Sequence, residues 1–168
     1  MLDILSHSLF FRKELLFIMI TMFPTIPVKI KPGTIMPKYA YEGDAGMDIC
    51  ATEDVTLYPG ETIVMKTGLS FEIPRGWVGY LHARSGTGTK GLVIKHGTSV
   101  IDSSYRGEVD LPLFNNNIDT VLVVKKGDRV AQIVFQPVGE VTLKEVDDLN
   151  KTDRGSKGFG SSGIGKRL

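Results

Sequence analysis

The feature that most constrains the fold of this chain is a repeated pattern of short apolar runs separated by turn residues. The runs are rich in β-branched residues, and the breaks between them contain Gly, Pro, Asn and Asp. Short strands at a spacing of roughly 8–12 residues are typical of an all-β sandwich, barrel or jelly roll. One short helix is expected near Ser85–Lys90, and strands are expected at Val28–Ile30, Val55–Leu57, Thr62–Lys66, Leu69–Ile73, Val78–His82, Leu92–Ile94, Glu108–Phe114, Thr120–Val124, Val130–Phe135 and Val141–Val146.

The composition narrows the class of protein. The 168 residues are enough for one domain, and the formal net charge of +1 argues against a nucleic-acid or membrane surface as partner. The single cysteine, Cys50, rules out an intramolecular disulfide and a structural zinc site built from cysteines. A reducing, cytoplasmic setting is therefore expected, with a nuclear or viral context left open.

The first residues need separate treatment. The apolar run Leu15–Phe23 follows the charged residues Arg12–Glu14 and is too short to span a membrane. The segment also lacks the basic start and small-residue cleavage site of a signal peptide. We expect residues 1–24 to be an extension outside the working domain. An arm that packs on a neighbour and a membrane role remain alternatives.

Polar and Gly-rich islands interrupt the β pattern, and such clusters at strand ends are where a β scaffold carries a site. Two GxGxxG sequences and one P-loop-like sequence lack the strand-to-helix context that phosphate loops require. Each island is weak evidence alone, but their order is specific. The islands are Ala45–Ile49, Arg84–Gly86, Val100–Gly107, Gly127–Gln132 and Arg154–Gly163.

Together the five islands resemble the five sequence motifs of the trimeric dUTPase family, over about residues 27–163. The resemblance implies a jelly-roll-like β-barrel subunit of the β-clip type and a homotrimer whose C-terminal tail reaches over a neighbouring active site. It also implies Mg²⁺-dependent hydrolysis of dUTP to dUMP and pyrophosphate. That reaction keeps uracil out of DNA and supplies dUMP for thymidylate synthesis. The expected division is 25–150 for the β domain and 151–168 for a flexible lid.

The first, second and fourth motifs suggest phosphate chemistry. Asp48 resembles the carboxylate that holds Mg²⁺ through water, although a turn or cap aspartate is the plain alternative. Arg84, Ser85 and Gly86 resemble a phosphate grip made of guanidinium, hydroxyl and backbone N–H groups. Gln132 resembles a neutral donor to the phosphate chain, or else a strand residue that faces solvent. Asp128 and Arg129, in contrast, are expected to serve a turn and an ion pair.

The third motif suggests the catalytic base and the sugar contact. Asp102 is the expected base, because a carboxylate can orient and deprotonate a water that attacks phosphorus in line. Tyr105 resembles the family's platform for the deoxyribose, which leaves no room for a 2′-hydroxyl. A core tyrosine is its alternative.

Base recognition in the family comes from backbone groups of the hairpin before the third motif, which corresponds here to Ile94–Ile101. His96, Ser99, Val100 and Ile101 are therefore expected to contact substrate. Ser99 stands where the motif usually opens with Gly, and His96 stands where many members have Asn, so these two contacts depart from the family pattern.

The last motif suggests a closing tail. Arg154, Gly160, Ser161 and Ser162 are expected at the γ-phosphate, and Phe159 is expected to stack on uracil. A solvated, disordered tail is the alternative. Two rival functions also remain: a dCTP deaminase, which would need a carboxylate that Ile94–Ile101 does not provide, and a regulatory module that binds a partner protein.

Overall fold

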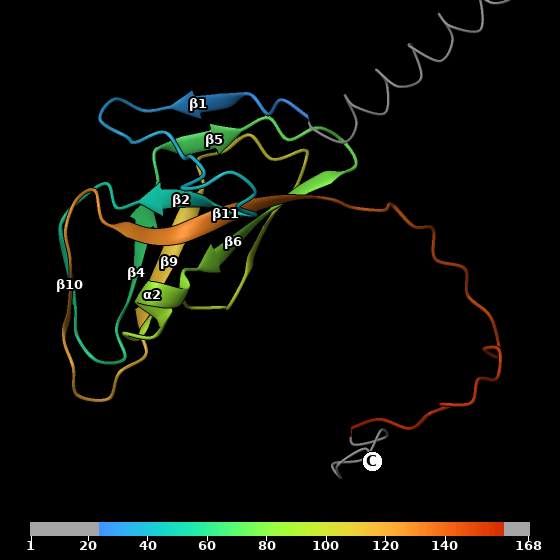
Figure 1. The fold of residues 1–168 in the computed structure, drawn as a ribbon. Helices are drawn as coiled ribbons and strands as arrows, with labels where there is room; N and C mark the ends of the chain where they lie inside the picture. Colours follow the sequence, from blue (N-terminus) through green and yellow to red (C-terminus); the bar gives the residue numbers. More distant parts are fainter. Residues whose placement is uncertain (1–23, 160–168) are drawn as a thin grey trace, which may run out of the picture.

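The computed structural model describes residues 24–159, which form a β body followed by an extended C-terminal arm (Figure 1). The single described helix is one turn long, so the expected all-β class is confirmed. The elements are β1 (Val28–Ile30), β2 (Met47–Cys50), β3 (Val55–Leu57), β4 (Thr62–Lys66), β5 (Leu69–Phe71), β6 (Trp77–Ala83), α2 (Ser85–Gly88), β7 (Leu92–Ile94), β8 (Ser99–Ile101), β9 (Asp110–Asn115), β10 (Leu122–Val124) and β11 (Arg129–Pro137).

The strand pairs among residues 24–159 are all antiparallel, and they form four small sheets. The four-stranded sheet has the order β2-β11-β6-β8, and the three-stranded sheet has the order β4-β9-β7. Two pairs, β1-β5 and β10-β3, complete the body. The longest strand, β11, lies between β2 and β6 and therefore determines which residues of those strands lie opposite each other.

The core lies between these sheets and follows from the alternation of side chains along each strand. In β9, Leu111 and Leu113 are completely buried, whereas Asp110 is exposed. Asn115 is also completely buried, but its side-chain amide donates to the carbonyl oxygens of Leu57 and Thr120. A buried polar group with its hydrogen bonds satisfied does not carry the usual burial penalty.

Nine of the ten strands expected from the sequence are present, with ends shifted by a few residues at most. The short helix is present as α2. The strands β2 and β8 were not predicted, because each is short and carries a polar residue. Their pairing with β11 and β6 is a tertiary effect that local pattern does not reveal.

The tenth expected strand, Val141–Val146, is wrong for the chain in isolation. Val141 and Leu143 alternate with polar residues, but the alternation breaks at Glu145 and no strand of the described range pairs with the segment. Val141 is 82% exposed and Leu143 is 92% exposed. As far as the structure describes it, the arm is tied to the body near its start, where Val138 N–H donates to the Gly76 carbonyl and Arg75 pairs with Glu140.

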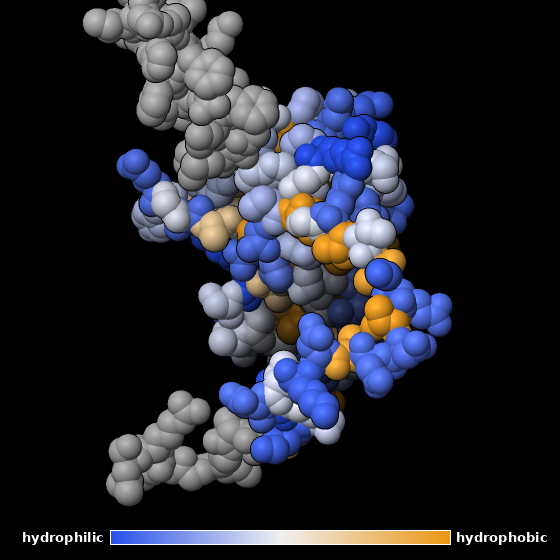
Figure 2. Space-filling model, turned by 90° about the vertical axis from the view of Figure 1, so that its right-hand side faces the viewer, coloured by the Kyte–Doolittle hydropathy of each residue, from blue (hydrophilic) through white to orange (hydrophobic). Residues whose placement is uncertain are grey.

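Viewed from the side of this arm, the surface shows apolar patches among hydrophilic residues (Figure 2). Within residues 24–159, no helix has the length and apolar character that crossing a membrane requires.

Candidate active site

Three polar side chains lie in one row across the four-stranded sheet. Gln132 on β11 is directly opposite Asp48 on β2 and directly opposite His82 on β6. Residues that face each other across antiparallel strands project from the same side of the sheet. The Gln132 amide donates to the Ala83 carbonyl at 3.1 Å, which fixes its orientation. The row therefore presents an oriented amide beside a carboxylate.

Two arginines hold the carboxylate of Asp48. Arg84 Nε lies 2.5 Å from Asp48 Oδ1, and Arg129 Nη1 lies 3.2 Å from Oδ2. Arg84 also donates to the Arg129 carbonyl at 3.3 Å, so the two arginines are linked. The Asp48 side chain is only 18% exposed. Two cations around one carboxylate leave net positive charge, which suits an anionic ligand.

These residues line one cleft of about 480 Å³, whose walls come from Ala40, Tyr41, Asp44, Ala45, Gly46, Asp48, Arg84, Ser85, Arg129 and Gln132. Gly46 leaves room for the Gln132 amide, since a Cβ at that position would lie 2.5 Å from the Gln132 side-chain oxygen and would displace it. The cleft thus brings together residues from the first, second and fourth islands. The alternatives of an isolated cap for Asp48 and a solvent-facing strand residue for Gln132 lose support.

Sequence reasoning gave Asp128 and Arg129 structural roles. Asp128 does accept from the Lys125 N–H at 2.8 Å across a turn. Arg129 does form an ion pair, but its partner is Asp48, so it is part of the cleft. Only the pairing of β2 with β11 reveals this, because the two residues are 81 positions apart.

The donor set fits a metal ion that keeps most of its waters. Within residues 24–159 there is no group of three or more His, Cys, Asp or Glu side chains that could form a protein cage. Asp48 is the carboxylate inside the cleft's cationic cluster. Mg²⁺ commonly binds through one or two carboxylates together with substrate phosphates. The site therefore suits Mg²⁺ that arrives with a phosphorylated ligand.

Asp48 also affects a neighbour on its own strand. Burial, followed by the Asp48 charge, raises the pKa of the Cys50 thiol. The thiol therefore stays protonated at neutral pH, and a protonated thiol is a poor nucleophile.

Asp102 and Tyr105 lie elsewhere, in the loop after β8, and neither lines this cleft. The Asp102 residue is exposed, and the Tyr105 N–H donates to its carbonyl at 3.1 Å. Tyr105 is 45% exposed, so it is not a core tyrosine. Its hydroxyl donates to the Glu108 carbonyl at 2.8 Å.

The segment expected to be a base-recognising hairpin differs from a simple hairpin. Strands β7 and β8 flank a turn closed by Gly97 N–H donating to the Ile94 carbonyl at 2.9 Å, with Gly97 at φ +82°. However, β7 pairs with β9 while β8 pairs with β6, because the longer strands offer each of them a partner. The turn therefore connects two sheets.

The side chains around this turn face different surroundings. His96 and Val100 are exposed, whereas Ile101 is buried. The Ser99 hydroxyl oxygen is buried and has no hydrogen-bond partner in the described chain.

The last motif is separated from the cleft in the single chain. The arm that carries Arg154 and Phe159 runs away from the β body (Figure 1), and Phe159 is fully exposed. Among the residues that the structure describes, the Arg154 side chain donates to the nearby Lys157 carbonyl at 3.1 Å. Gly160, Ser161 and Ser162 lie outside the described residues, as does the extension before residue 24.

A β body with a cleft of linked arginines and an oriented amide is suited to an anionic ligand such as a phosphate group. The model of the dUTPase family matches residues 33–163. The deoxyuridine 5′-triphosphate nucleotidohydrolase of Thermobifida fusca is 40% identical over 84% of this chain and 82% of its own length. That of Nocardia farcinica is 43% identical over 82% of this chain and 85% of its own length. The chain therefore belongs to the dUTPase family, and the resemblance seen in its motifs is confirmed.

Solved structures of dUTPases are similar to this chain in fold. The dUTPase of Staphylococcus bacteriophage 80alpha, bound to dUpNHpp, has a TM-score of 0.76 at 33% identity and covers 84% of this chain and 100% of its own. A mutant dUTPase of phage phi11 of S. aureus, in which a structural Mg(II) ion is coordinated, has a TM-score of 0.69 at 30% identity and covers 76% of this chain and 99% of its own.

Proposed function

We propose that this protein hydrolyses dUTP to dUMP and pyrophosphate with Mg²⁺, by in-line attack of water at the α-phosphorus. The observation that carries the proposal is the cleft in which Arg84, Arg129 and Gln132 surround Asp48, within a chain of the dUTPase family. A triphosphate has several negative charges, and the cleft supplies cationic and neutral donors aimed at one volume. A cytoplasmic location would put the enzyme where this nucleotide is found.

The arginines and their neighbours would bind the phosphate chain. Arg84 can turn from Asp48 toward a phosphate, and Ser85 and Gly86 follow it at the start of α2. Bound Mg²⁺ would neutralise phosphate charge, and Asp48 would hold its waters. Before the substrate arrives, the ion pairs with Asp48 would hold the two guanidinium groups in the cleft; the phosphates would then compete for them.

Asp102 would act as the general base. Its position on an exposed loop, without a cation bound to its carboxylate among the described residues, leaves it free to accept a proton from water. A positioned base contributes about 10²–10⁴-fold to a rate.

The turn and Tyr105 would select the substrate. Backbone groups around His96, Ser99, Val100 and Ile101 can match the O4 and N3–H pattern of uracil and mismatch the amino group of cytosine. The exposed Tyr105 ring would lie against the deoxyribose and exclude a 2′-hydroxyl.

We infer that the working enzyme is a homotrimer with shared sites. Asp102, Tyr105 and Phe159 do not line the Asp48 cleft of their own chain, and the arm that carries Phe159 runs away from the β body. A second subunit would supply the Asp102 loop, and the tail of a third would close the site with Arg154, Phe159, Gly160, Ser161 and Ser162.

A regulatory second role is the remaining alternative. Phage dUTPases such as the 80alpha protein control transfer of virulence genes by a proto-oncogenic G protein-like mechanism. At 33% identity to that protein, this chain could share a partner-binding surface. Partner capture with and without dUpNHpp would test it, because a partner that depends on nucleotide would be retained in only one condition.

The reaction itself is tested by incubating purified protein with Mg²⁺ and each deoxynucleoside triphosphate, together with UTP. We expect dUTP to be converted to dUMP and pyrophosphate far faster than dTTP, dCTP or UTP. Release of ammonia, or comparable turnover of dCTP, would contradict the proposal.

A further inference from the structure

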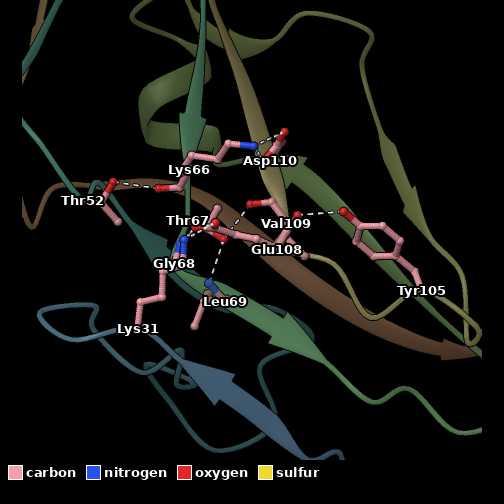
Figure 3. A network of polar contacts seen from close by, with 10 residues as sticks. All are labelled: Lys31, Thr52, Lys66, Thr67, Gly68, Leu69, Tyr105, Glu108, Val109 and Asp110. Atoms are coloured by element: carbon pink, nitrogen blue, oxygen red, sulfur yellow. Dashed lines mark hydrogen bonds and ion pairs between the residues drawn. The ribbon is translucent and has the colours of Figure 1, made fainter.

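Tyr105 is held in place by a polar network that reaches another part of the β body (Figure 3). Its hydroxyl donates to the Glu108 carbonyl oxygen at 2.8 Å. The position of the Tyr105 ring therefore depends on the position of the Glu108 backbone. The segment 108–109 lies between the Tyr105 ring and the turn that joins β4 to β5 (Figure 3).

The Glu108 side chain is bound through its carboxylate on the side away from Tyr105. Its carboxylate accepts from Lys31 Nζ at 2.6 Å and from the Gly68 N–H at 2.8 Å. The Glu108 side chain is only 17% exposed, whereas the Lys31 side chain is 61% exposed, so the carboxylate is largely covered while the lysine lies at the surface. Lys31 and Gly68 are themselves joined, because the Lys31 N–H donates to the Gly68 carbonyl at 2.9 Å.

The next residue, Val109, is also held by hydrogen bonds. The Val109 carbonyl accepts from the Thr67 hydroxyl at 2.8 Å, and the Val109 N–H donates to the Leu69 carbonyl at 2.8 Å. Thr67 is 1% exposed, and its hydroxyl also accepts from the Leu69 N–H at 3.3 Å. The β4–β5 turn thus holds the backbone on which the tyrosine hydroxyl rests.

Gly107 supplies the room for this arrangement. A Cβ at Gly107 would lie 2.4 Å from Tyr105 Oη and 2.6 Å from its Cζ atom. The backbone at Gly107 does not have a positive φ, so the requirement for glycine comes from the ring and not from backbone strain. The ring is confined between a residue without a side chain and an anchored carbonyl.

We propose that Glu108 is a positioning residue for substrate selection: its carboxylate, bound by Lys31 and Gly68, fixes the carbonyl that holds Tyr105 against the sugar. This inference rests on the proposed role of Tyr105 at the deoxyribose. Deoxy selectivity requires a ring that cannot retreat, since a platform that moves would admit a ribose. Lys31, far away in sequence, therefore contributes to the choice between dUTP and UTP.

The test compares kcat/KM for dUTP and UTP in the wild type and in Glu108→Ala, Glu108→Gln and Lys31→Met. The matched control is Asp110→Asn, which breaks the neighbouring Lys66–Asp110 ion pair without touching Glu108 or Tyr105. Thermal unfolding and light scattering establish that each variant keeps its fold and assembly.

We expect Glu108→Ala to lower the dUTP-to-UTP ratio by roughly tenfold, because small displacements of a positioning group cost up to about 10²-fold. Glu108→Gln should fall between wild type and Glu108→Ala, since an amide oxygen still accepts from Gly68. Lys31→Met, at a side chain that is 61% exposed, should shift the ratio in the same direction without endangering the fold. A purely structural role would lower both activities together and leave the ratio unchanged.

An unchanged ratio in folded Glu108→Ala and Lys31→Met, with a wild type that discriminates, would overturn the inference. A wild type that hydrolyses UTP as well as dUTP would instead overturn the proposed role of Tyr105. Gly107→Ala provides an independent check: it should lower the ratio at least as much as Glu108→Ala, and an unchanged ratio would contradict the confinement of the ring.

Discussion

The Asp48 cleft and the Asp102 loop differ in how their polar groups are used within one chain. In the cleft, Asp48 is bound by two arginines and Gln132 is bound to a backbone carbonyl. In the loop, the Asp102 residue is exposed, and the Tyr105 ring is anchored at its hydroxyl with its surface open. One region is already a formed cleft, whereas the other presents its side chains to solvent.

This difference indicates which groups of the active site would come from the same subunit and which from a neighbouring subunit. A cleft in which the one largely buried carboxylate is paired with two arginines can form in a monomer, because the desolvated Asp48 charge has its partners. An exposed acid and an exposed aromatic ring make chemical sense when a ligand held by another subunit lies against them. The same reasoning applies to the arm that carries Phe159, because its apolar residues are exposed and no strand of the described chain pairs with it.

The largest effect is expected from Asp102→Asn. An amide can hold a water molecule but cannot take its proton, so kcat should fall by about 10²–10⁴-fold while dUTP binding is kept. Steady-state turnover and calorimetric titration with dUpNHpp measure the two quantities. Asp119→Asn, at another exposed aspartate, is the control. Near-normal turnover of Asp102→Asn would place the base elsewhere.

Truncation after Asp153 should have the next largest effect. It removes Arg154, Phe159 and the serines together, and each lost transition-state donor of this kind costs about 10²–10³-fold in kcat. The β body ends its pairing at Pro137, so thermal unfolding and assembly should be unchanged. Wild-type turnover of the truncated protein would identify the tail as a solvated end.

A smaller effect is expected from Phe159→Ala. Base–aromatic stacking is worth about 1–3 kcal/mol, and the loss should appear mainly as a raised KM for dUTP. Ile118→Ala is the matched control, because Ile118 is an apolar residue that is 96% exposed elsewhere on the body. Equal KM values for the two variants would argue against stacking.

The smallest effect concerns acid stability. The hydrogen bond from Lys31, with that from Gly68, lowers the pKa of Glu108 below its ordinary value. A carboxylate with a lowered folded pKa contributes stability above its ordinary pKa, and this stability is lost as the pH falls toward the folded pKa. Urea unfolding between neutral and acidic pH should therefore show a steeper loss in the wild type than in Glu108→Gln. Parallel curves would show that the Glu108 contacts do not persist in solution.

Much of the fold could be predicted from sequence, because alternation and turn residues act locally. The bounds of β1, β3, β4 and β7 were predicted directly. The strand β2 was missed because Asp48 interrupts its apolar pattern, and Val141–Val146 was expected as a strand although alternation alone does not supply a partner.

The site could be predicted only in part. The motif residues Asp48, Arg84 and Gln132 do line one cleft. The role of Arg129 in that cleft depends on the register between β2 and β11. The proposed role of Glu108 in holding Tyr105 depends on a hydrogen bond from a turn 40 residues earlier. Neither relation leaves a local signal in the sequence. The positions of Asp102, Arg154 and Phe159 relative to the cleft require neighbouring subunits and remain predictions.

We propose that each active site combines groups from different subunits, and mixed trimers test this arrangement most directly. Asp102→Asn and Arg84→Ala chains would be refolded together in equal amounts, with native mass spectrometry to confirm mixing. If the Asp102 loop and the Arg84 cleft come from different subunits, about one site in four is complete in a random mixture, so dUTP turnover should return to roughly a quarter of the wild-type value. Turnover no higher than that of the separate variants, in trimers shown to be mixed, would contradict the shared site.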